Sequence, residues 1–560
     1  MSEALLSVRN LGVAYGGAGR AVDGVSFDVA RGEAVALVGE SGSGKTATAL
    51  ALMGLLPPRT ARVSGSVLFE GHGLLSAAPD AIRRLRGARI GMVFQEPMTS
   101  LNPVLTIGRQ MTEGLFVHRG LTRRAAEARA AAMLERVGLS EPVQRLRQYP
   151  HELSGGMRQR TMIAMAMVLE PALLVADEPT TALDVSIQAQ VLALMAELTR
   201  EFGTSLLLIT HDMGVVAETA DRVVVLRHGK VVEEAPARTL FRAPQARYTA
   251  DLLAAVPRID DRSRARRADL VAGQPILRFD AVSKVFRGGS FGGGRRVQAL
   301  DQVSLDVHAG EVVALVGESG SGKSTLGRVA VRLTRPDSGS VFVAGGDFTQ
   351  LRGRALREAR AGIQMIFQDP FASLDPLRTA GQTIAEPLVV LGRRAGARDR
   401  AAELMERVGL SRSMLDRKPH QFSGGQRQRL AIARALATGP AIVIADEPTS
   451  ALDVSVQAQV LDLLAALQRD GGLALLFISH DLAVVRRIAD RVAVMRNGRI
   501  VEVGRADDVL DRPAHPYTRA LIDAAPMPDP ERRGRVRLPI PPAARPGPLH
   551  EIAPKHWVAT

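Results

Sequence analysis

Short, continuously apolar segments recur in the same order in both halves of the chain. They are Ala34–Val38, Ala172–Ala176 and the segment ending before Thr210, and then Val312–Val316, Ala441–Ala445 and the segment ending before Ser479. Runs of this length are typical of strands buried on both faces of a parallel sheet. Residues 106–139 instead show a helical period, and Gly-punctuated alternation near the N-terminus predicts antiparallel strands. The pattern predicts an α/β fold that is present twice.

The two halves are a tandem duplication of one domain. Ala176–Leu192 (ADEPTTALDVSIQAQVL) matches Ala445–Leu461 (ADEPTSALDVSVQAQVL) at all but two positions, with an offset of 446 − 177 = 269. Such a period is far too long for a solenoid, and 560 residues are too many for one core. We expect domains over residues 1–257 and 275–526, a linker over 258–274, and a Pro- and Arg-rich tail over 527–560 that is extended or disordered.

One motif, VALVGESGSGK, occurs letter for letter at Val35–Lys45 and Val313–Lys323. In each copy the first four residues belong to an apolar run and the Gly-rich part follows that run. Its glycines let backbone N–H groups turn toward phosphate oxygens, its lysine reaches the terminal phosphates, and the following hydroxyl suits a magnesium ion. A Gly/Ser turn without a ligand is the simpler interpretation of one copy, but two identical copies favour two nucleoside triphosphate sites. The predicted binding residues are Gly39, Ser41, Gly42, Ser43, Gly44, Lys45 and Thr46, and then Gly317, Ser319, Gly320, Ser321, Gly322, Lys323, Ser324 and Thr325.

Paired acids end an apolar run in each half. They are Asp177-Glu178 and Asp446-Glu447. A buried strand delivers such side chains to the carboxyl edge of a sheet, where α/β folds bind ligands. We expect the aspartate to complete a magnesium shell with the hydroxyl that follows the motif lysine, and the glutamate to polarise the attacking water.

Two further polar side chains follow apolar strands in both halves. Gln95 and Gln368 stand before a Pro-bounded loop, and His211 and His480 follow the strand after the acid pair. A strand-end glutamine is commonly an ordinary polar terminus, and a lone histidine is commonly a core or cap residue. Because each recurs with the same flanks, we assign the glutamines to magnesium or water contact and the histidines to catalysis.

Two more repeated features indicate nucleotide contacts. The segments LSGG and FSGG combine a helix-capping serine with two glycines that allow a ligand to approach the backbone closely. Tyr15 and Phe286 lie at matching positions and suit a stack on a base ring, with simple packing as the alternative. The residues assigned to phosphate contact in the two segments are Ser154, Gly155, Gly156, Ser423, Gly424 and Gly425.

Composition and charge narrow the choice of function. The chain has no cysteine, which excludes disulfides, thiolate zinc sites and iron–sulfur clusters. The net charge of +14 suits a nucleic-acid partner, but the basic residues are scattered without interleaved aromatics. A solvated surface, or one facing anionic lipid headgroups, is therefore favoured, and no nucleic acid is expected. The segment MSEALLSVRN lacks the basic-then-apolar layout of a secretion signal, and Glu170-Pro171 interrupts the most apolar stretch, so we expect any membrane association to be peripheral.

With these motifs assembled, the chain resembles two fused nucleotide-binding domains of an ATP-binding-cassette transporter, from Leu5 to about Pro526. The resemblance implies a P-loop NTPase (RecA-like) α/β core with an antiparallel β subdomain and a helical subdomain, duplicated in tandem. It identifies LSGG and FSGG as the family signature, and the ALD segments Ala182–Asp184 and Ala451–Asp453 as the D-loops.

More narrowly, three segments are similar to the peptide/nickel-type importer ATPases. They are QEPMTSLNP from Gln95, QDPFASLDP from Gln368 and HPYTRALIDAAP from His515; the first half lacks the His-Pro before Tyr248. The resemblance implies ATP and Mg²⁺ as cofactors, peptides or related small solutes as cargo, and two integral-membrane permease subunits as partners. Through the permeases it implies a solute-binding protein, and it implies a peripheral location on the cytoplasmic face of the inner membrane.

In that family each nucleotide lies between the phosphate loop of one domain and the signature of the other. The resemblance therefore implies one site in which Lys45, Thr46, Gln95, Asp177, Glu178 and His211 face Ser423, Gly424, Gly425 and Asp453. The reciprocal site pairs Lys323, Ser324, Gln368, Asp446, Glu447 and His480 with Ser154, Gly155, Gly156 and Asp184. Because neither half lacks a catalytic position, we expect both sites to hydrolyse ATP.

Two other ATPase classes share these motifs. A soluble translation factor with twin cassettes would need a long charged helical arm between its domains, whereas the linker expected here is short. A DNA-repair or chromosome-organising ATPase would need zinc-binding cysteines or a long coiled-coil insertion, and the sequence contains neither. The importer interpretation is preferred.

Overall fold

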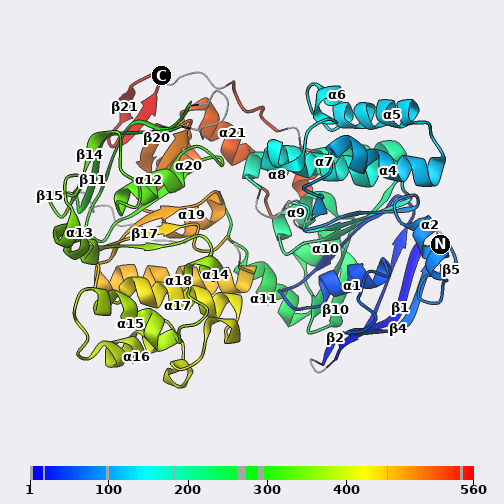
Figure 1. Cartoon of the computed structure of the whole chain (residues 1–560), viewed down its shortest axis with the longest axis horizontal. Coiled ribbons are helices and arrows are strands. Elements are labelled where there is room, and N and C mark those ends of the chain that lie inside the picture. The colour runs from blue at the N-terminus through cyan, green and yellow to red at the C-terminus, as the bar shows by residue number, and fades with distance from the viewer. Residues whose placement is uncertain are drawn as a thin grey trace. The chain divides into compact units, whose positions relative to one another are not determined.

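The computed structural model describes residues 4–16, 19–95, 100–180, 183–261, 273–287, 296–450, 452–535, 537–542 and 547–560, apart from the Phe371 side chain. The chain divides into two compact units (Figure 1). The first contains Met1–Leu183, Ile187–Val256 and Pro526–Val536, and the second contains Asp184–Ser186, Pro257–Ala525 and Arg537–Thr560. Most of the expected linker, and Ala182 and Ala451 of the two ALD segments, lie outside the described residues.

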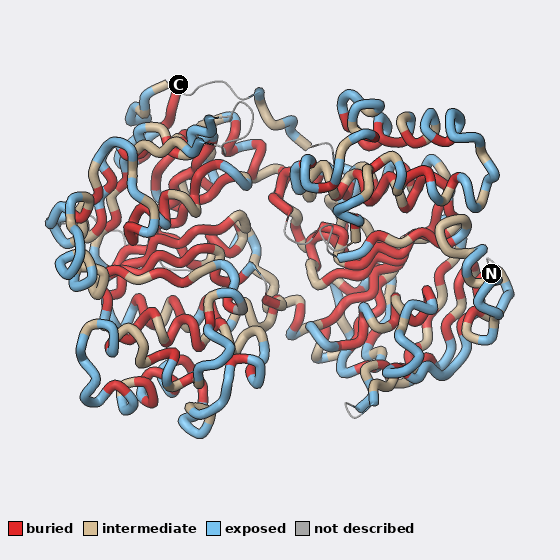
Figure 2. Tube along the Cα trace, in the orientation of Figure 1, coloured by how far each residue is buried: buried red, intermediate tan, exposed pale blue. Residues whose placement is uncertain are grey.

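A mostly parallel sheet forms the core of the first unit. Its described strands run in the order β10-β9-β3-β8-β7-β6, and only β10 is antiparallel to its neighbour. The central strands are buried along their length (Figure 2), because both faces of a parallel sheet are covered. The strands are β3 (Ala34–Val38), β6 (Ile90–Val93), β7 (Leu173–Asp177), β8 (Ser205–Ile209), β9 (Arg222–Arg227) and β10 (Lys230–Pro236).

An antiparallel sheet and a set of helices complete the first unit. The sheet has the order β2-β1-β4-β5, formed by β1 (Ala4–Tyr15), β2 (Arg20–Ala30), β4 (Ala61–Phe69) and β5 (His72–Gly73), which confirms the antiparallel strands expected near the N-terminus. The helices are α1 (Lys45–Leu52), α2 (Pro79–Leu85), α4 (Ile107–Arg119), α5 (Arg123–Arg136), α6 (Pro142–Arg145), α7 (Gly155–Met167), α8 (Val185–Phe202), α9 (Met213–Thr219), α10 (Ala237–Arg242) and α11 (Arg247–Ala255).

The second unit repeats this plan. Its antiparallel sheet has the order β12-β11-β14-β15, and its described core strands have the order β16-β17-β18-β13-β19-β20-β22-β21. The strands are β11 (Leu277–Arg287), β12 (Arg296–Val307), β13 (Val312–Val316), β14 (Ser338–Val343), β15 (Gly346–Asp347), β16 (Ile363–Ile366), β17 (Ile442–Asp446), β18 (Ala474–Ile478), β19 (Arg491–Arg496), β20 (Arg499–Arg505), β21 (Leu549–Ala553) and β22 (His556–Ala559). The helices are α12 (Lys323–Ala330), α13 (Gly353–Ala359), α14 (Pro370–Ser373), α15 (Ala380–Val390), α16 (Ala397–Arg407), α17 (Gly424–Leu436), α18 (Val454–Gly471), α19 (Leu482–Ile488), α20 (Ala506–Asp511) and α21 (Pro516–Ala524).

The end of the chain forms a hairpin, so the expectation of an extended or disordered tail is wrong there. Strand β22 pairs with β20 and β21 pairs with β22, which extends the core sheet of the second unit. A buried carboxylate fixes this edge: Glu502 is 0% exposed and accepts hydrogen bonds from the N–H groups of Ala514 and His515. His556 Nε2 lies 2.8 Å from Glu502 Oε1.

An earlier part of the tail, Pro526–Val536, belongs to the first unit. Arg533 donates to Asp221 Oδ1 at 2.6 Å, and Glu531 accepts from Arg242 at 2.9 Å. Exposed ion pairs of this kind stabilise a fold only weakly. Pro526 also packs against Gly214 in α9, and this contact helps to hold the segment on the first unit.

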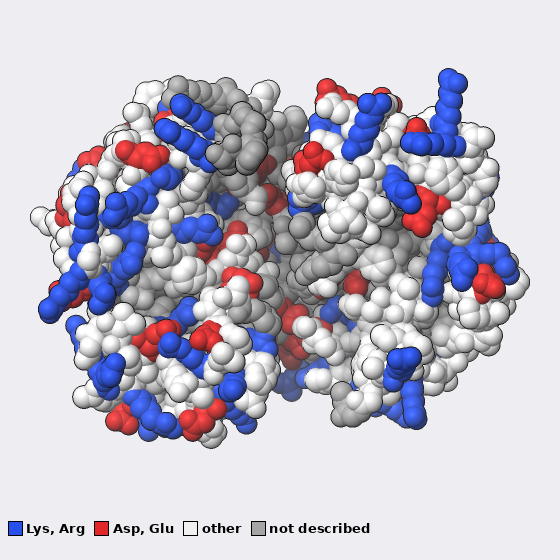
Figure 3. All heavy atoms as spheres, viewed as in Figure 1, with Lys and Arg blue, Asp and Glu red and all other residues white. Residues whose placement is uncertain are grey.

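The described surface carries both signs of charge. On the face shown in Figure 3, Lys and Arg side chains are spread over both units and gather toward the left edge of the view, with Asp and Glu side chains among them. Within the described part of the chain, no helix has the length and apolar character needed to cross a membrane.

The Glu502 contact gives a prediction for stability. Replacing His556 by Ala removes one partner of a buried carboxylate and should lower the free energy of unfolding of the second unit by about 1–3 kcal/mol. Urea unfolding followed by the fluorescence of Trp557, the single tryptophan of the chain, measures this change next to the mutated site. The control is His550→Ala, because His550 is exposed on β21. Equal stability of the two variants would contradict the prediction.

Candidate active sites

Each phosphate-loop motif lies between a buried strand and a helix. The first joins β3 to α1 and the second joins β13 to α12. Gly44 precedes α1 with φ of 99°, and a Cβ there would lie 2.5 Å from the carbonyl oxygen of Ala21. Gly322 has φ of 108°, and its Cβ would lie 2.3 Å from the Ala299 oxygen. Only glycine fits both the backbone conformation and the space at these points.

The motif lysines fold back over their own loops. Lys45 Nζ donates to the carbonyl oxygens of Gly39 at 2.7 Å and Glu40 at 2.9 Å, and Lys323 repeats both contacts at the same distances. Burial lowers the pKa of Lys323, although nearby carboxylates, first that of Asp184, oppose the shift. A buried ammonium held in this way is well placed to bind an anion that enters the loop.

Two buried hydroxyls indicate that the loops fit phosphate. The Oγ atoms of Ser43 and Ser321 are buried and have no hydrogen-bond partner within the described part of the chain. Buried polar atoms of folded proteins normally have a partner, and such a partner can be a bound ligand. Phosphate oxygens are acceptors for these hydroxyls and for the N–H groups at the start of α1 and α12.

A hydroxyl and a carboxylate meet beside each loop. Thr46 Oγ1 donates to Asp177 Oδ1 at 3.3 Å, and Ser324 Oγ donates to Asp446 Oδ1 at 2.9 Å. Burial raises the pKa of Asp177 to about 6 and raises that of Asp446 as well. In the described residues, no group of three or more His, Cys, Asp or Glu side chains is arranged for a metal ion. The oxygen pair fits magnesium, which commonly takes one or two protein oxygens and fills its shell with water and phosphate.

In the first unit, one carboxylate brings together three of the residues assigned from the sequence. Gln95 Nε2 donates to Glu178 Oε2 at 2.7 Å, and His211 Nδ1 lies 3.1 Å from Glu178 Oε1. The three side chains come from the ends of β6, β7 and β8. Parallel strands therefore bring segments distant in sequence to the same sheet edge.

The second unit repeats the arrangement. Gln368 Nε2 lies 2.8 Å from Glu447 Oε2, and His480 Nδ1 lies 3.1 Å from Glu447 Oε1. Burial alone would raise the pKa of Glu447, but its hydrogen bond with His480 and the charge of that ring outweigh burial and lower the pKa. The same contact raises the pKa of His480 against the opposing effect of burial. The carboxylate is therefore held in its ionised form.

Both glutamates have a left-handed backbone, which sequence reasoning missed. Glu178 and Glu447 each have φ of 46°, a region that non-glycine residues rarely adopt. Their N–H groups donate to Ile209 and Ile478 on the neighbouring strands at 2.8 and 3.0 Å. Such strain persists where the surroundings hold it, and it is common at functional sites.

The signature serines cap helices, as expected. Ser154 Oγ accepts from the Met157 N–H at the start of α7, and Ser423 Oγ accepts from the Gln426 N–H at the start of α17. Ser154, Gly155 and Ser423 are exposed. Each unit therefore presents a helix N-terminus that is open to a ligand or to another protein surface.

The remaining assigned residues are distributed around these centres. Tyr15 ends β1, Phe286 lies near the end of β11 and is 45% exposed, and Asp453 precedes α18. Asp184, which is grouped with the second unit, accepts a hydrogen bond from the Ser319 N–H at 2.6 Å. Burial raises the pKa of Asp184, while the Ser319 N–H and the Lys323 charge oppose the shift.

Sequence reasoning also missed that one tyrosine near the C-terminal end of each half packs against an arginine. The Arg227 guanidinium lies 4.6 Å from the Tyr248 ring centre, and Arg496 lies at the same distance from Tyr517. The tyrosines are 517 − 248 = 269 positions apart, the offset of the paired acids, and this regularity was the available signal.

Comparisons with known proteins agree with this geometry. The ABC transporter family profile matches residues 22–181 and 300–450, and the profile "oligopeptide/dipeptide transporter, C-terminal region" matches residues 232–289 and 501–548. The glutathione import ATP-binding protein GsiA of Pectobacterium atrosepticum is 47% identical over 99% of this chain and 96% of its own length. Its Escherichia coli K12 namesake is 48% identical over 95% of this chain and 91% of its own.

Among solved structures, a dimeric ATP-binding cassette in a post-hydrolysis state bound to ADP and Pi is 33% identical to this chain. The alignment covers 41% of this chain and 98% of that protein's chain, with a TM-score of 0.38. The family profile covers more than half of this chain, and its match in each half includes the phosphate loop and the acid pair. The chain therefore belongs to the ABC transporter family of ATP-binding, ATP-hydrolysing proteins.

Proposed function

We propose that this chain is the ATP-hydrolysing, energy-coupling subunit of an importer for peptides or related small solutes. Its relatives are named as glutathione import ATP-binding proteins, and both halves match the C-terminal region of oligopeptide/dipeptide transporters. The observation that carries the proposal is the glutamate held by glutamine and histidine beside a phosphate loop, intact in both units.

In this proposal Glu178 and Glu447 polarise the water that attacks the terminal phosphate. An ionised carboxylate is required for this role, and the lowered pKa of Glu447 supports it. Gln95 and His211 hold the two oxygens of Glu178 from opposite sides and thereby orient it. The lysine ammonium and the loop N–H groups stabilise the charge that develops on the phosphate oxygens.

We assign a magnesium ion to the hydroxyl and carboxylate pairs, Thr46 with Asp177 and Ser324 with Asp446. When bound there, the ion would neutralise charge on the phosphates. The amide nitrogens of Gln95 and Gln368 already donate to the glutamates, so their amide oxygens are the atoms available to a metal ion or its water.

Each ATP is proposed to lie between the phosphate loop of one half and the signature of the other. The exposed, capped helix starts at Ser154 and Ser423 suit the second side of such a site. Tyr15 and Phe286 would stack on the adenine rings.

The free energy available from two nucleotides is sufficient to close the halves. Moving a two-state equilibrium from 1:99 to 99:1 needs about 5.5 kcal/mol. Two ATP molecules that each favour the closed form by ~100-fold supply about 2.7 kcal/mol apiece. Hydrolysis removes the phosphate that both halves contact, and the halves then separate.

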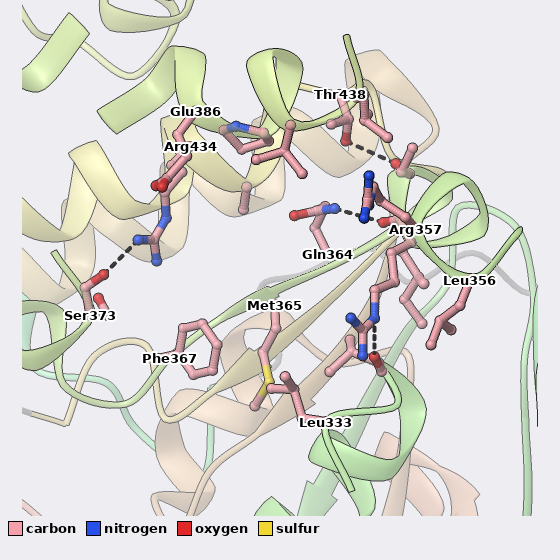
Figure 4. A pocket seen from close by; sticks show the side chains of 18 of the residues that line it. Leu333, Leu356, Arg357, Gln364, Met365, Phe367, Ser373, Glu386, Arg434 and Thr438 are labelled. Atoms are coloured by element: carbon pink, nitrogen blue, oxygen red, sulfur yellow. Dashed lines mark hydrogen bonds between the residues drawn. The ribbon is translucent and has the colours of Figure 1, made fainter. Parts of the chain in front are cut away.

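Two integral-membrane permease subunits are the proposed partners, and through them a solute-binding protein. A groove of about 540 Å³ in the second unit suits a segment of one permease (Figure 4). Leu333, Met365 and Phe367 form an apolar side, and Arg434 with Glu386 forms a charged end. Leu333 and Val390 both line this groove and are each 55% exposed, so apolar surface is available to a partner there.

The proposed location is the cytoplasmic face of the inner membrane, with peripheral attachment through these permeases. On the face shown in Figure 3, acidic side chains lie among the basic ones, so this face offers no support to a nucleic-acid partner.

The first prediction concerns turnover. The double variant Glu178→Gln with Glu447→Gln should bind ATP but release phosphate at least about 100-fold more slowly, because a general base contributes 10²–10⁴-fold to rate. Phosphate release at saturating ATP measures the loss. Glu197→Gln is the control, because Glu197 is an exposed acid on α8. Undiminished release from the double variant would remove both glutamates from the mechanism.

The second prediction concerns the groove. Leu333→Asp with Val390→Asp should abolish co-purification with the permease subunits and leave ATP binding unchanged, because two carboxylates would replace apolar contacts and would have to lose their hydration when the partner binds. Leu538→Asp is a matched control, since Leu538 is 53% exposed and does not line the groove. Recovery of the permeases with the groove variant at the control level would refute this docking site.

A further inference from the structure

Helix α21 contacts the second phosphate loop although it lies beyond the residues that match the ABC transporter profile. Tyr517, at its start, is 0% exposed, and its hydroxyl oxygen accepts a hydrogen bond from the Glu318 N–H at 3.1 Å. The two residues are 199 positions apart. Tyr517 lies in the C-terminal region match, residues 501–548, whereas the ABC transporter match in this half ends at residue 450.

The residue held by this bond is central to the loop. The carbonyl oxygen of Glu318 accepts from Lys323 Nζ at 2.9 Å and from the Ser321 N–H at 3.1 Å. The N–H and C=O groups of Glu318 flank one Cα atom, so fixing the first restricts the second. Tyr517 therefore restricts the position of an acceptor that holds the phosphate-binding lysine.

Two further contacts fix Tyr517 itself. The Arg496 guanidinium lies 4.6 Å from its ring centre, and its own N–H donates to His515 Nδ1 at 3.1 Å. The His515 N–H in turn donates to Glu502, the buried carboxylate that also contacts His556 of β22. A chain of contacts thus runs from the C-terminal hairpin to the phosphate loop within the second unit.

The phenol remains protonated under ordinary conditions. Burial raises the pKa of Tyr517 well above its usual value, and the nearby Glu318 carboxylate adds to the shift. The oxygen is therefore a neutral acceptor whose contact with the Glu318 N–H does not vary over physiological pH.

We propose that Tyr517 is a positioning residue for the second ATP site, through which the C-terminal region holds the phosphate loop in its nucleotide-binding form. The proposal rests on the proposed function, because it requires that this loop binds ATP. Its substrate class is the same nucleoside triphosphate, and Tyr517 acts through the Glu318 backbone without touching the nucleotide.

The test is Tyr517→Phe in a Lys45→Ala background, in which binding reports on the second site. Phenylalanine keeps the ring and its stack on Arg496 and removes only the hydroxyl. The dissociation constant for the non-hydrolysable analogue AMP-PNP should rise about 3- to 10-fold, the range expected for the loss of one intramolecular hydrogen bond. The KM for ATP should rise by the same factor with kcat unchanged, because the loop contacts phosphate in ground and transition states alike.

Tyr248→Phe in the same background is the matched control. It makes the same change at the equivalent position of the first half, and it should leave the second-site dissociation constant within twofold of the Lys45→Ala parent. A rise of equal size in this control would overturn the proposal, because the effect would then not arise at the second loop.

A thermal measurement separates positioning from folding. The proposal predicts a smaller AMP-PNP-induced rise of the unfolding midpoint in Tyr517→Phe than in the parent. If the variant unfolds earlier yet shows the parent's nucleotide-induced rise, Tyr517 is only structural and the proposal is wrong. If the Lys45→Ala parent binds no AMP-PNP, the proposed function of the second site fails instead, which is a distinct result.

Discussion

The proposed catalytic geometry depends on a glutamate that directly follows a buried parallel strand and has a left-handed backbone conformation. A parallel strand is stable only when both faces of its sheet are covered. The elements that cover the sheet in each unit therefore also hold this glutamate in place. The turn at Glu178 directs its carboxylate to Gln95 and His211 on the flanking strands. The strain there is offset by the backbone bond to Ile209 and by these side chains. The phosphate loop lies beside the same sheet edge, and its hydroxyl reaches the neighbouring Asp177.

The duplication preserved this centre while other parts of the halves diverged. Arg434 and Gln364 line the groove of the second unit, but Met165 and Gly91 occupy the equivalent places in the first. The core sheet of the second unit also continues into β22 and β21. Both units keep the glutamine, the acid pair and the histidine, whereas these two side chains of the groove are not repeated in the first half.

Much of the fold could be predicted from the sequence, because the strands and loops that form it have recognisable patterns within a few consecutive residues. Apolar runs such as Ala34–Val38 predicted buried strands, and fixed motif spacing predicted the loops that the structure places at the sheet edge. Contacts between residues that are distant in the sequence could not be predicted, because no pattern of neighbouring residues indicates them. Strand β22 has four residues and depends on pairing with β20, so its periodicity was too short to recognise. The bond between Tyr517 and Glu318 joins distant segments, and the left-handed glutamates follow from tertiary constraint rather than residue preference. The roles assigned to the site residues remain predictions.

Proximity of opposite halves in the nucleotide-bound state tests the central claim most directly. The chain contains no cysteine, so Ser41→Cys with Ser423→Cys introduces a single pair, one on the first phosphate loop and one on the second signature. A short thiol cross-linker should join the pair within one chain when AMP-PNP is bound, and much less with ADP, as judged by gel mobility and mass. Absence of the intramolecular product with AMP-PNP, or products formed only between separate chains, would contradict the composite site.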